Sequence, residues 1–262
     1  MLDDAPVTPL DQAPATDGRV PTADDELGRR VADNVARVRD RIARAAADAG
    51  RDPASVRLLV ATKTQPVAAV RAAVAAGVDL VGENRVQELK SKAPGLADLV
   101  ERGALEVHLI GPLQRNKVGA ALRSCACVET VDSLALAERL SARALERGDD
   151  LDVMVQVNVS GEATKSGVRP AAAADLALAV AALPAIHLTG FMTIGARTND
   201  DATVRHGFAQ LRDLRDDVAG QAAGTSSARE LSMGMSGDLE LAVAEGATIV
   251  RVGTAVFGAR RA

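Results

Sequence analysis

The chain has 262 residues, of which 47% are hydrophobic and 25% are charged, a composition typical of a soluble globular protein of one large domain or two small ones. With 31 basic and 35 acidic side chains the formal net charge is -4, so we expect no nucleic-acid partner. The chain contains no Trp and no Tyr, which excludes mechanisms that need a tyrosine base. The histidines are scattered and no CxxC or HExxH motif occurs, so we expect no metal site.

The beginning of the chain predicts a disordered tail. Residues 1–23 are rich in Pro, Asp, Ala and Thr and have neither a basic nor a long apolar segment, which argues against a signal peptide. The most apolar later run, 171–186, is interrupted by an acidic residue and a proline and falls short of a membrane span. Cys125 and Cys127 lie one residue apart and make a disulfide framework improbable. We therefore expect a cytoplasmic protein that contacts no membrane and has residues 24–262 as its folded domain.

An amphipathic helix is expected to open this domain. Apolar residues recur at spacings of three and four from Leu27 to Ile42. Asp24 or Asp25 is available as the N-cap, and Gly50 lies just beyond the expected end.

Short apolar segments then alternate with alanine-rich helical segments. The expected strands are 57–61, 78–81, 107–110, 127–131, 153–159, 186–190, 230–232 and 248–252. Strict alternation of strand and helix predicts a parallel α/β sheet, and eight units most simply close into a single (β/α)8 TIM barrel. A doubly wound open sheet is the alternative, but no GxGxxG motif follows the first expected strand.

In such a barrel the chemistry lies where the strands end. Lys63 follows the first strand, and Gly/Ser/Thr-rich loops begin at Ser232 and Arg251, at the ends of the seventh and eighth strands. Loops at these two places commonly bind phosphate through backbone N–H groups. A lysine facing a phosphorylated carbonyl compound favours Schiff-base chemistry with a sugar phosphate or with pyridoxal phosphate. From position alone, Lys63 is equally well a strand-end lysine that reaches solvent.

Seven motifs, in order, resemble those of the pyridoxal-phosphate homeostasis protein family, also called the YggS or proline synthetase co-transcribed family. They run from about Leu58 to Arg260 and read ATKTQP, GENRVQE, HLIGPLQRNK, QVNVSGEATKSG, GFMTIG, SMGMSGDLELA and IVRVGTAVFGAR. One departure is Arg85, where many members have an aromatic residue, which removes any contact that an aromatic ring would make there.

The resemblance implies a single barrel, similar to the N-terminal domain of fold-type III alanine racemases, that binds pyridoxal 5′-phosphate covalently. On matching positions it implies a Schiff base at Lys63, a pyridine-nitrogen contact at Arg251 and a ring contact at Asn84. The phosphate ligands that it implies are Ser232, Gly253 and Thr254, assisted by Ser236. An arginine can only donate, so it leaves the ring nitrogen unprotonated and makes the ring a weaker electron sink.

The resemblance favours a carrier over an enzyme. Racemisation needs an acid/base group on each face of the substrate, but the chain has no Tyr, and we expect both cysteines at the opposite end of the barrel from the cofactor. We predict a monomeric pyridoxal-phosphate carrier or buffer in vitamin B6 homeostasis that supplies pyridoxal-phosphate-dependent apoenzymes without substantial catalysis. The alternatives are a fold-type III amino-acid racemase, an aldolase-like enzyme with Glu83 as the only nearby carboxylate, and a protein that signals cofactor status to a partner.

Overall fold

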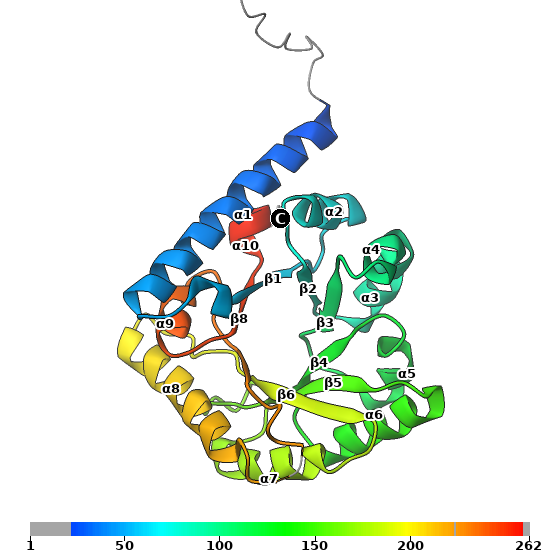
Figure 1. The fold of residues 1–262 in the computed structure, drawn as a ribbon, viewed down its shortest axis with the longest axis vertical. Coiled ribbons are helices and arrows are strands. Elements are labelled where there is room, and N and C mark those ends of the chain that lie inside the picture. The colour runs from blue at the N-terminus through cyan, green and yellow to red at the C-terminus, as the bar shows by residue number, and fades with distance from the viewer. Residues whose placement is uncertain (1–21, 223, 259–262) are drawn as a thin grey trace, which may run out of the picture.

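The computed structural model describes residues 22–222 and 224–258, in which eight parallel strands close into a barrel (Figure 1). Each strand pairs with the next along the chain, and the eighth pairs with the first. The strands are β1 (Arg57–Ala61), β2 (Leu80–Glu83), β3 (Glu106–Leu109), β4 (Cys127–Val131), β5 (Leu151–Gln156), β6 (Ile186–Met192), β7 (Glu230–Ser232) and β8 (Ile249–Val252). The expected (β/α)8 barrel is therefore confirmed, whereas the tail expected over residues 1–23 lies almost wholly outside the described residues.

Helices surround the barrel and connect its strands (Figure 1). They are α1 (Ala23–Asp48), α2 (Val67–Ala75), α3 (Val86–Lys92), α4 (Ala97–Glu101), α5 (Val118–Ala121), α6 (Leu134–Arg147), α7 (Pro170–Ala181), α8 (Asp201–Val218), α9 (Leu239–Ala244) and α10 (Thr254–Phe257), with short 3-10 turns η1 (Pro53–Ser55), η2 (Ala93–Gly95) and η3 (Arg115–Lys117). Within the described residues, none of these helices has the length and apolar character to cross a membrane.

Helix α1 begins slightly earlier than expected and covers the closure of the barrel. Its N-cap is Thr22, not Asp24 or Asp25: the Thr22 hydroxyl accepts from the Asp25 N–H, and the Asp25 carboxylate accepts from the Thr22 N–H. This reciprocal arrangement is a capping box. The helix packs against α2, α9 and α10 and so spans the line where β8 meets β1 (Figure 1). One polar tie in this contact is Asn34 Nδ2, which donates to the carbonyl of Val256 at 2.7 Å.

Alternation along the strands divides the buried side chains into two groups. One apolar cluster lies inside the barrel and consists of Leu59, Leu80, Ile110, Cys127, Met154, Met192 and Ile249. A larger cluster lies between the outer face of the strands and the helices. The Cβ that an alanine would place at Gly82 lies 2.6 Å from Leu59 and 2.8 Å from Ile110, which shows how tightly the interior is packed.

Five strands differ in their bounds from the sequence-based prediction: β3 is shifted by one residue, β8 begins one residue later, and the larger differences are in β2, β5 and β6. Strand β2 ends at Glu83 instead of Val81, β5 occupies Leu151–Gln156 instead of 153–159, and β6 continues to Met192. The charged residue Glu83 ends β2, and its partners Thr62 and Lys92 come from other parts of the chain, so local hydrophobicity could not identify it as a strand residue. The end of β6, in contrast, is the apolar pair Phe191 and Met192.

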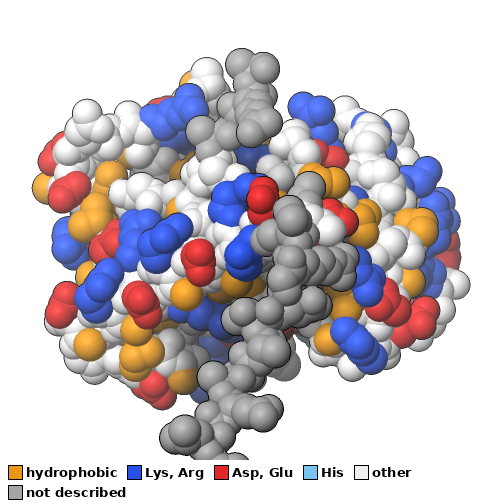
Figure 2. Space-filling view, turned by 90° about the horizontal axis from the view of Figure 1, so that it is seen from above, with side chains coloured by type: hydrophobic (Ala, Val, Ile, Leu, Met, Phe, Trp, Pro, Cys, Tyr) orange, Lys and Arg blue, Asp and Glu red, His pale blue; other side chains and the backbone are white. Residues whose placement is uncertain are grey.

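Charges of both signs are mixed on the surface. On the face shown in Figure 2, Lys and Arg side chains lie among Asp and Glu side chains, without a continuous basic patch in view. Two surface ion pairs are Arg41 with Glu240 and Arg71 with Asp98, each at 2.7 Å. Exposed pairs of this kind contribute only about 0–1 kcal/mol each, so the barrel depends mainly on its two apolar clusters.

Candidate functional site

The carboxyl ends of β1 and β8 bring Lys63 close to the loop after β8. Lys63 is exposed two residues beyond the end of β1. Strand β8 pairs directly with β1, and a Cβ at Gly253 would lie 3.1 Å from the carbonyl oxygen of Ala61. Glycine therefore permits this close approach of the two backbones.

The backbone before Lys63 is held by a buried polar group. The Thr62 hydroxyl donates to Glu83 Oε1 at 2.6 Å, and Lys92 Nζ donates to the Thr62 carbonyl at 2.7 Å and to Glu83 Oε1 at 2.6 Å. Both the threonine and the carboxylate are almost fully buried. These bonds fix the direction in which the chain leaves β1.

The backbone after Lys63 is held as well. Thr64 has φ of 63°, a left-handed conformation that is unfavourable for a β-branched residue, and its N–H donates to Glu88 Oε1 at 3.0 Å. No hydrogen bond of the Lys63 side chain is found among the described residues. The structure thus anchors the chain on both sides of Lys63 and leaves its amine accessible.

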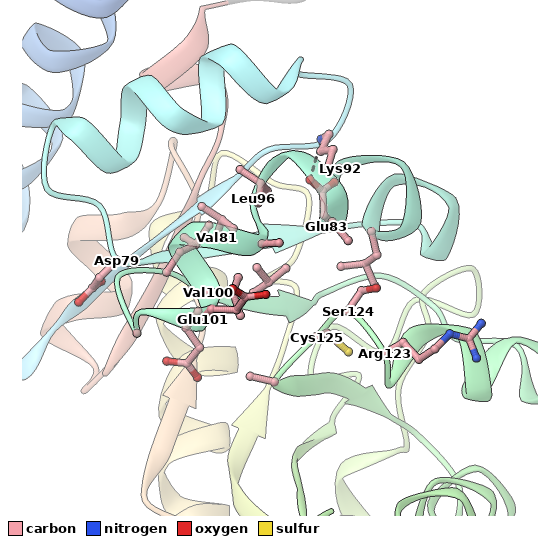
Figure 3. A pocket seen from close by; sticks show the side chains of 18 of the residues that line it. Asp79, Val81, Glu83, Lys92, Leu96, Val100, Glu101, Arg123, Ser124 and Cys125 are labelled. Carbon is pink, nitrogen blue, oxygen red and sulfur yellow. Dashed lines mark hydrogen bonds and ion pairs between the residues drawn. The ribbon is translucent and has the colours of Figure 1, made fainter. Parts of the chain in front are cut away.

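Glu83 is not a carboxylate of the rim. Its side chain points away from the barrel interior toward α3, where burial raises its pKa and the contacts with Lys92 and Thr62 oppose that rise. Figure 3 shows Glu83 and Lys92 together at one end of a cavity of about 670 Å³ on the outer side of β2 and β3, next to Val81 and Leu96. Glu83, the only nearby carboxylate that the sequence offered for an aldolase-like enzyme, is therefore engaged with Thr62 and Lys92, which weakens that alternative.

Two hydroxyl groups and several backbone N–H groups form a small polar rim at the ends of β7 and β8. The hydroxyl of Thr254 donates to that of Ser236 at 3.2 Å, and both side chains are accessible. The Asp238 carboxylate accepts from the Met235 N–H at 2.6 Å and shapes the loop between them. Among the hydrogen bonds of the described residues, none uses the N–H of Gly253 or Thr254, which lie at the start of α10. Free N–H groups and hydroxyls are the donors that a phosphate ester needs.

Arg251 lies in the barrel interior below this rim. Its NH1 donates to the Ser232 hydroxyl at 2.8 Å and its NH2 donates to the Thr193 carbonyl at 2.6 Å. Burial lowers the pKa of Arg251, while the negative charges of Glu129 and Asp238 oppose that shift. These bonds fix the plane of the guanidinium group.

Ser232, which was expected to bind the phosphate, is the last residue of β7. It is fully buried, accepts from Arg251 and donates to Glu129 Oε2 at 2.5 Å. The Ser232 hydroxyl therefore has two charged partners among the described residues, Arg251 and Glu129. Ser236, whose hydroxyl is accessible, is the serine that the structure places at the rim.

A chain of polar side chains continues from Ser232 through the barrel interior. Glu129 Oε1 lies 2.7 Å from His108 Nδ1, and His108 Nε2 lies 2.8 Å from Glu106 Oε1. Glu106 Oε2 in turn accepts from Arg57 at 2.9 Å. Sequence reasoning did not anticipate this series of contacts, although the alternation that puts Glu106, His108 and Glu129 at inward positions of β3 and β4 was a usable signal.

The pKa values of the side chains in this interior series are shifted by burial and by the charges of their neighbours. Burial alone would lower the pKa of His108, but the hydrogen bonds and charges of Glu106 and Glu129 raise it to about 9. The hydrogen bond from His108 lowers the pKa of Glu106 to about 2 against the opposing effect of burial. Burial would raise the pKa of Glu129, but His108, Arg251 and Ser232 lower it.

Asn84 follows β2 at the same rim and is half-buried. Its Oδ1 is buried and has no hydrogen-bond partner within the described part of the chain, and the same holds for Oε1 of Gln156 at the end of β5. Buried acceptors without partners are unusual in folded proteins. Asn84 was expected to contact the cofactor ring, whereas no such contact was expected of Gln156.

Both cysteines are free and lie near the amino end of β4. Cys127 is the first residue of that strand and faces the barrel interior, and burial raises the pKa of Cys125 to about 12. Lys63 lies at the carboxyl ends of the strands. The cysteines are therefore at the other end of the barrel, as expected.

Comparison with known proteins connects this geometry to a family. Residues 33–261 match the family described as alanine racemase, N-terminal domain. A curated relative from Pseudomonas aeruginosa, named pyridoxal phosphate homeostasis protein, is 47% identical over 230 residues, which cover 88% of this chain and 96% of the relative.

Two solved structures are similar throughout their length. A protein of unknown function from Bifidobacterium adolescentis has a TM-score of 0.86 and 49% identity, and the match covers 90% of this chain and 98% of that one. PipY from Synechococcus elongatus, solved with PLP bound, has a TM-score of 0.74 and 37% identity, and the match covers 87% of this chain and 100% of that one.

Proposed function

The chain belongs to the pyridoxal phosphate homeostasis protein family, as its seven motifs indicated, and we propose that it binds pyridoxal 5′-phosphate and buffers or carries it inside the cell. The observation that carries this proposal is the accessible amine of Lys63 beside the donor-rich loop at Gly253. A relative solved with this cofactor, PipY, supports it.

The residues present fit the cofactor. It has three recognisable parts: an aldehyde, a phosphate ester and a pyridine ring. Lys63 offers an amine for the first, the N–H groups and hydroxyls at Ser236, Gly253 and Thr254 offer donors for the second, and the buried Arg251 offers a donor for the third. The unpartnered Oδ1 of Asn84 marks a polar position at the same rim.

We assign each residue one task. Lys63 Nζ holds the cofactor covalently, as a Schiff base, while the flanking bonds of Thr62 and Thr64 fix the backbone that carries the lysine. Gly253 and Thr254 bind the phosphate at the start of α10 with the help of Ser236. Arg251 donates toward the ring nitrogen and keeps it unprotonated. When bound, the cofactor supplies an electron-withdrawing ring, and an arginine at its nitrogen makes that ring a weaker electron sink.

The same geometry favours storage over racemisation. A racemase needs a second acid/base group opposite the lysine. The chain has no Tyr, Glu83 points outward, and both cysteines lie near the amino end of β4. We therefore propose that the protein acts without substantial catalysis and gives up its cofactor to pyridoxal-phosphate-dependent apoenzymes.

We further propose that the protein acts as a monomer in the cytoplasm. The most exposed large apolar side chains of the described residues are few and dispersed: Val100 on α4, Leu134 and Leu145 at opposite ends of α6, and Ile194 and Met235 in the loops after β6 and β7. The free state of both cysteines agrees with a reducing compartment.

The test is to locate the bound cofactor. Purified protein is incubated with pyridoxal phosphate, reduced with borohydride and digested, and the modified lysine is identified by mass spectrometry. We expect the adduct on Lys63, its absence in Lys63→Ala, and its retention in Lys90→Ala, which removes an exposed lysine of α3. An adduct elsewhere, or none, would refute the proposal.

A second assay separates a carrier from an enzyme. The loaded protein is mixed with a pyridoxal-phosphate-dependent apoenzyme in the presence of a scavenger of free cofactor, and recovery of that enzyme's activity is measured. We expect more recovery than with the same amount of free cofactor. Racemisation of an amino acid at rates typical of enzymes, about 1 per second or faster, would instead establish the racemase alternative.

A further inference from the structure

We propose that Ser232, Glu129 and His108 are positioning residues for Arg251, so that the cofactor site extends through the barrel interior to its opposite end. This inference rests on the proposed binding of pyridoxal phosphate. The three residues touch no cofactor themselves. They act by holding the one guanidinium group that would face its ring.

We call the hydrogen-bonded series Arg251, Ser232, Glu129, His108 and Glu106 the relay. The direction of every hydrogen bond in it can be assigned. Arginine only donates, so Arg251 donates to the Ser232 hydroxyl, which leaves the hydroxyl proton for Glu129. Glu129 lies 2.7 Å from one ring nitrogen of His108, and Glu106 lies 2.8 Å from the other. An ionised carboxylate only accepts, so the arrangement is satisfied when both ring nitrogens of His108 carry protons.

The charges along the relay alternate in sign. Arg251 is positive, Glu129 negative, His108 positive and Glu106 negative, and all except Glu106 are buried. A buried charge is costly without a partner of opposite sign. Each charge therefore depends on its neighbour, and the orientation of Arg251 depends on Glu129 through a single hydroxyl group.

Ser232 is the informative position because its loss leaves every charge in place. Ser232→Ala removes only the oxygen that joins Arg251 to Glu129. The matched control is Ser141→Ala, which removes a hydroxyl of α6 that is also almost fully buried and also makes a hydrogen bond, to the Pro184 carbonyl at 2.7 Å. Glu129→Gln is a second variant that keeps the side-chain shape and removes the negative charge.

The experiment measures three properties of each variant: the midpoint of thermal unfolding without cofactor, the dissociation constant for pyridoxal phosphate, and the absorbance maximum of the bound cofactor. We expect Ser232→Ala to bind about 10-fold more weakly, as the loss of one hydrogen bond to a charged group predicts, and to shift the absorbance maximum. Ser141→Ala should lose stability but keep the wild-type affinity and absorbance. Glu129→Gln should show the same spectral change as Ser232→Ala.

The outcomes separate this inference from the function on which it rests. If the wild-type protein forms no adduct at Lys63, the proposed function is refuted, and the inference that rests on it is refuted as well. If wild type forms the adduct but Ser232→Ala and Glu129→Gln keep the wild-type affinity and absorbance, the relay only stabilises the fold and the inference is refuted while the proposed function stands. A shift in both variants, absent from Ser141→Ala, supports it.

Discussion

The stability of the protein should fall as the pH rises through the range in which His108 loses its proton. In the folded protein its pKa is raised to about 9, against an ordinary value of 6.5 that applies to the unfolded chain. Between these two values the folded state binds one more proton than the unfolded state. The stabilisation is thus fully present below pH 6.5 and is lost as the pH approaches 9.

The size of the effect follows from the same two values. Each pH unit between them is equivalent to about 1.4 kcal/mol, so the interval from 6.5 to about 9 corresponds to about 3 kcal/mol. The lowered pKa values of Glu106 and Glu129 describe the same contacts and add nothing further to this figure. For a urea dependence of about 3 kcal/mol per molar, the unfolding midpoint should fall by about 1 M.

The assay is urea unfolding at a series of pH values, followed by circular dichroism because the chain lacks Trp and Tyr. Other groups near His108 also titrate: burial raises the pKa of Cys127 and that of Asp152. His108→Gln controls for them, since it keeps both groups and removes the imidazole. We expect the difference in stability between wild type and His108→Gln to shrink steadily from pH 6.5 to 9. Parallel curves over that range would refute the reasoning.

Two further substitutions test the packing that supports the site. An alanine at Gly111 would place its Cβ 2.1 Å from the Asn84 carbonyl oxygen, so Gly111→Ala should lower the free energy of unfolding by about 1–3 kcal/mol and weaken cofactor binding. Urea unfolding and cofactor titration measure these two effects. The control is Gly237→Ala, which has no atom within 4 Å of its Cβ and should change neither property. Lys92→Met leaves Glu83 buried without its cation and should lower the free energy of unfolding by about 3–5 kcal/mol in the same urea assay. A double variant that adds Glu83→Gln should recover part of this free energy. No recovery would contradict the pairing of Lys92 with Glu83.

Much of the fold could be predicted because its signals are local. The bounds of β1, β4 and β7 agree with the sequence-based prediction, since each is a short run of residues flanked by turn-forming or helical segments. Lys63 and Gly253 could be placed at one rim because the carboxyl ends of all strands in a parallel barrel meet there.

The interior relay could not be predicted in the same way. Its bonds join β3 to β4, β4 to β7 and β7 to β8, and Ser232 lies 103 positions from Glu129 along the chain. No local pattern reports which polar residues of different strands share a layer of the barrel. The N-cap of α1 was misplaced for a different reason: Thr22 and Asp25 form a local capping box, but the cap was assigned to the acidic residues Asp24 or Asp25 themselves.

The position of α1 has a consequence for how the protein is made. This helix precedes every other element of the barrel in the chain and can pack early against α2, whereas its partners α9 and α10 follow only after seven of the eight strands. The apolar side of α1, which includes Val31, Val35 and Val38, is therefore only partly covered in the nascent chain until α9 and α10 have been synthesised. Translation pauses or truncations late in the message would leave this side only partly covered, and such chains should be the ones that chaperones and proteases bind.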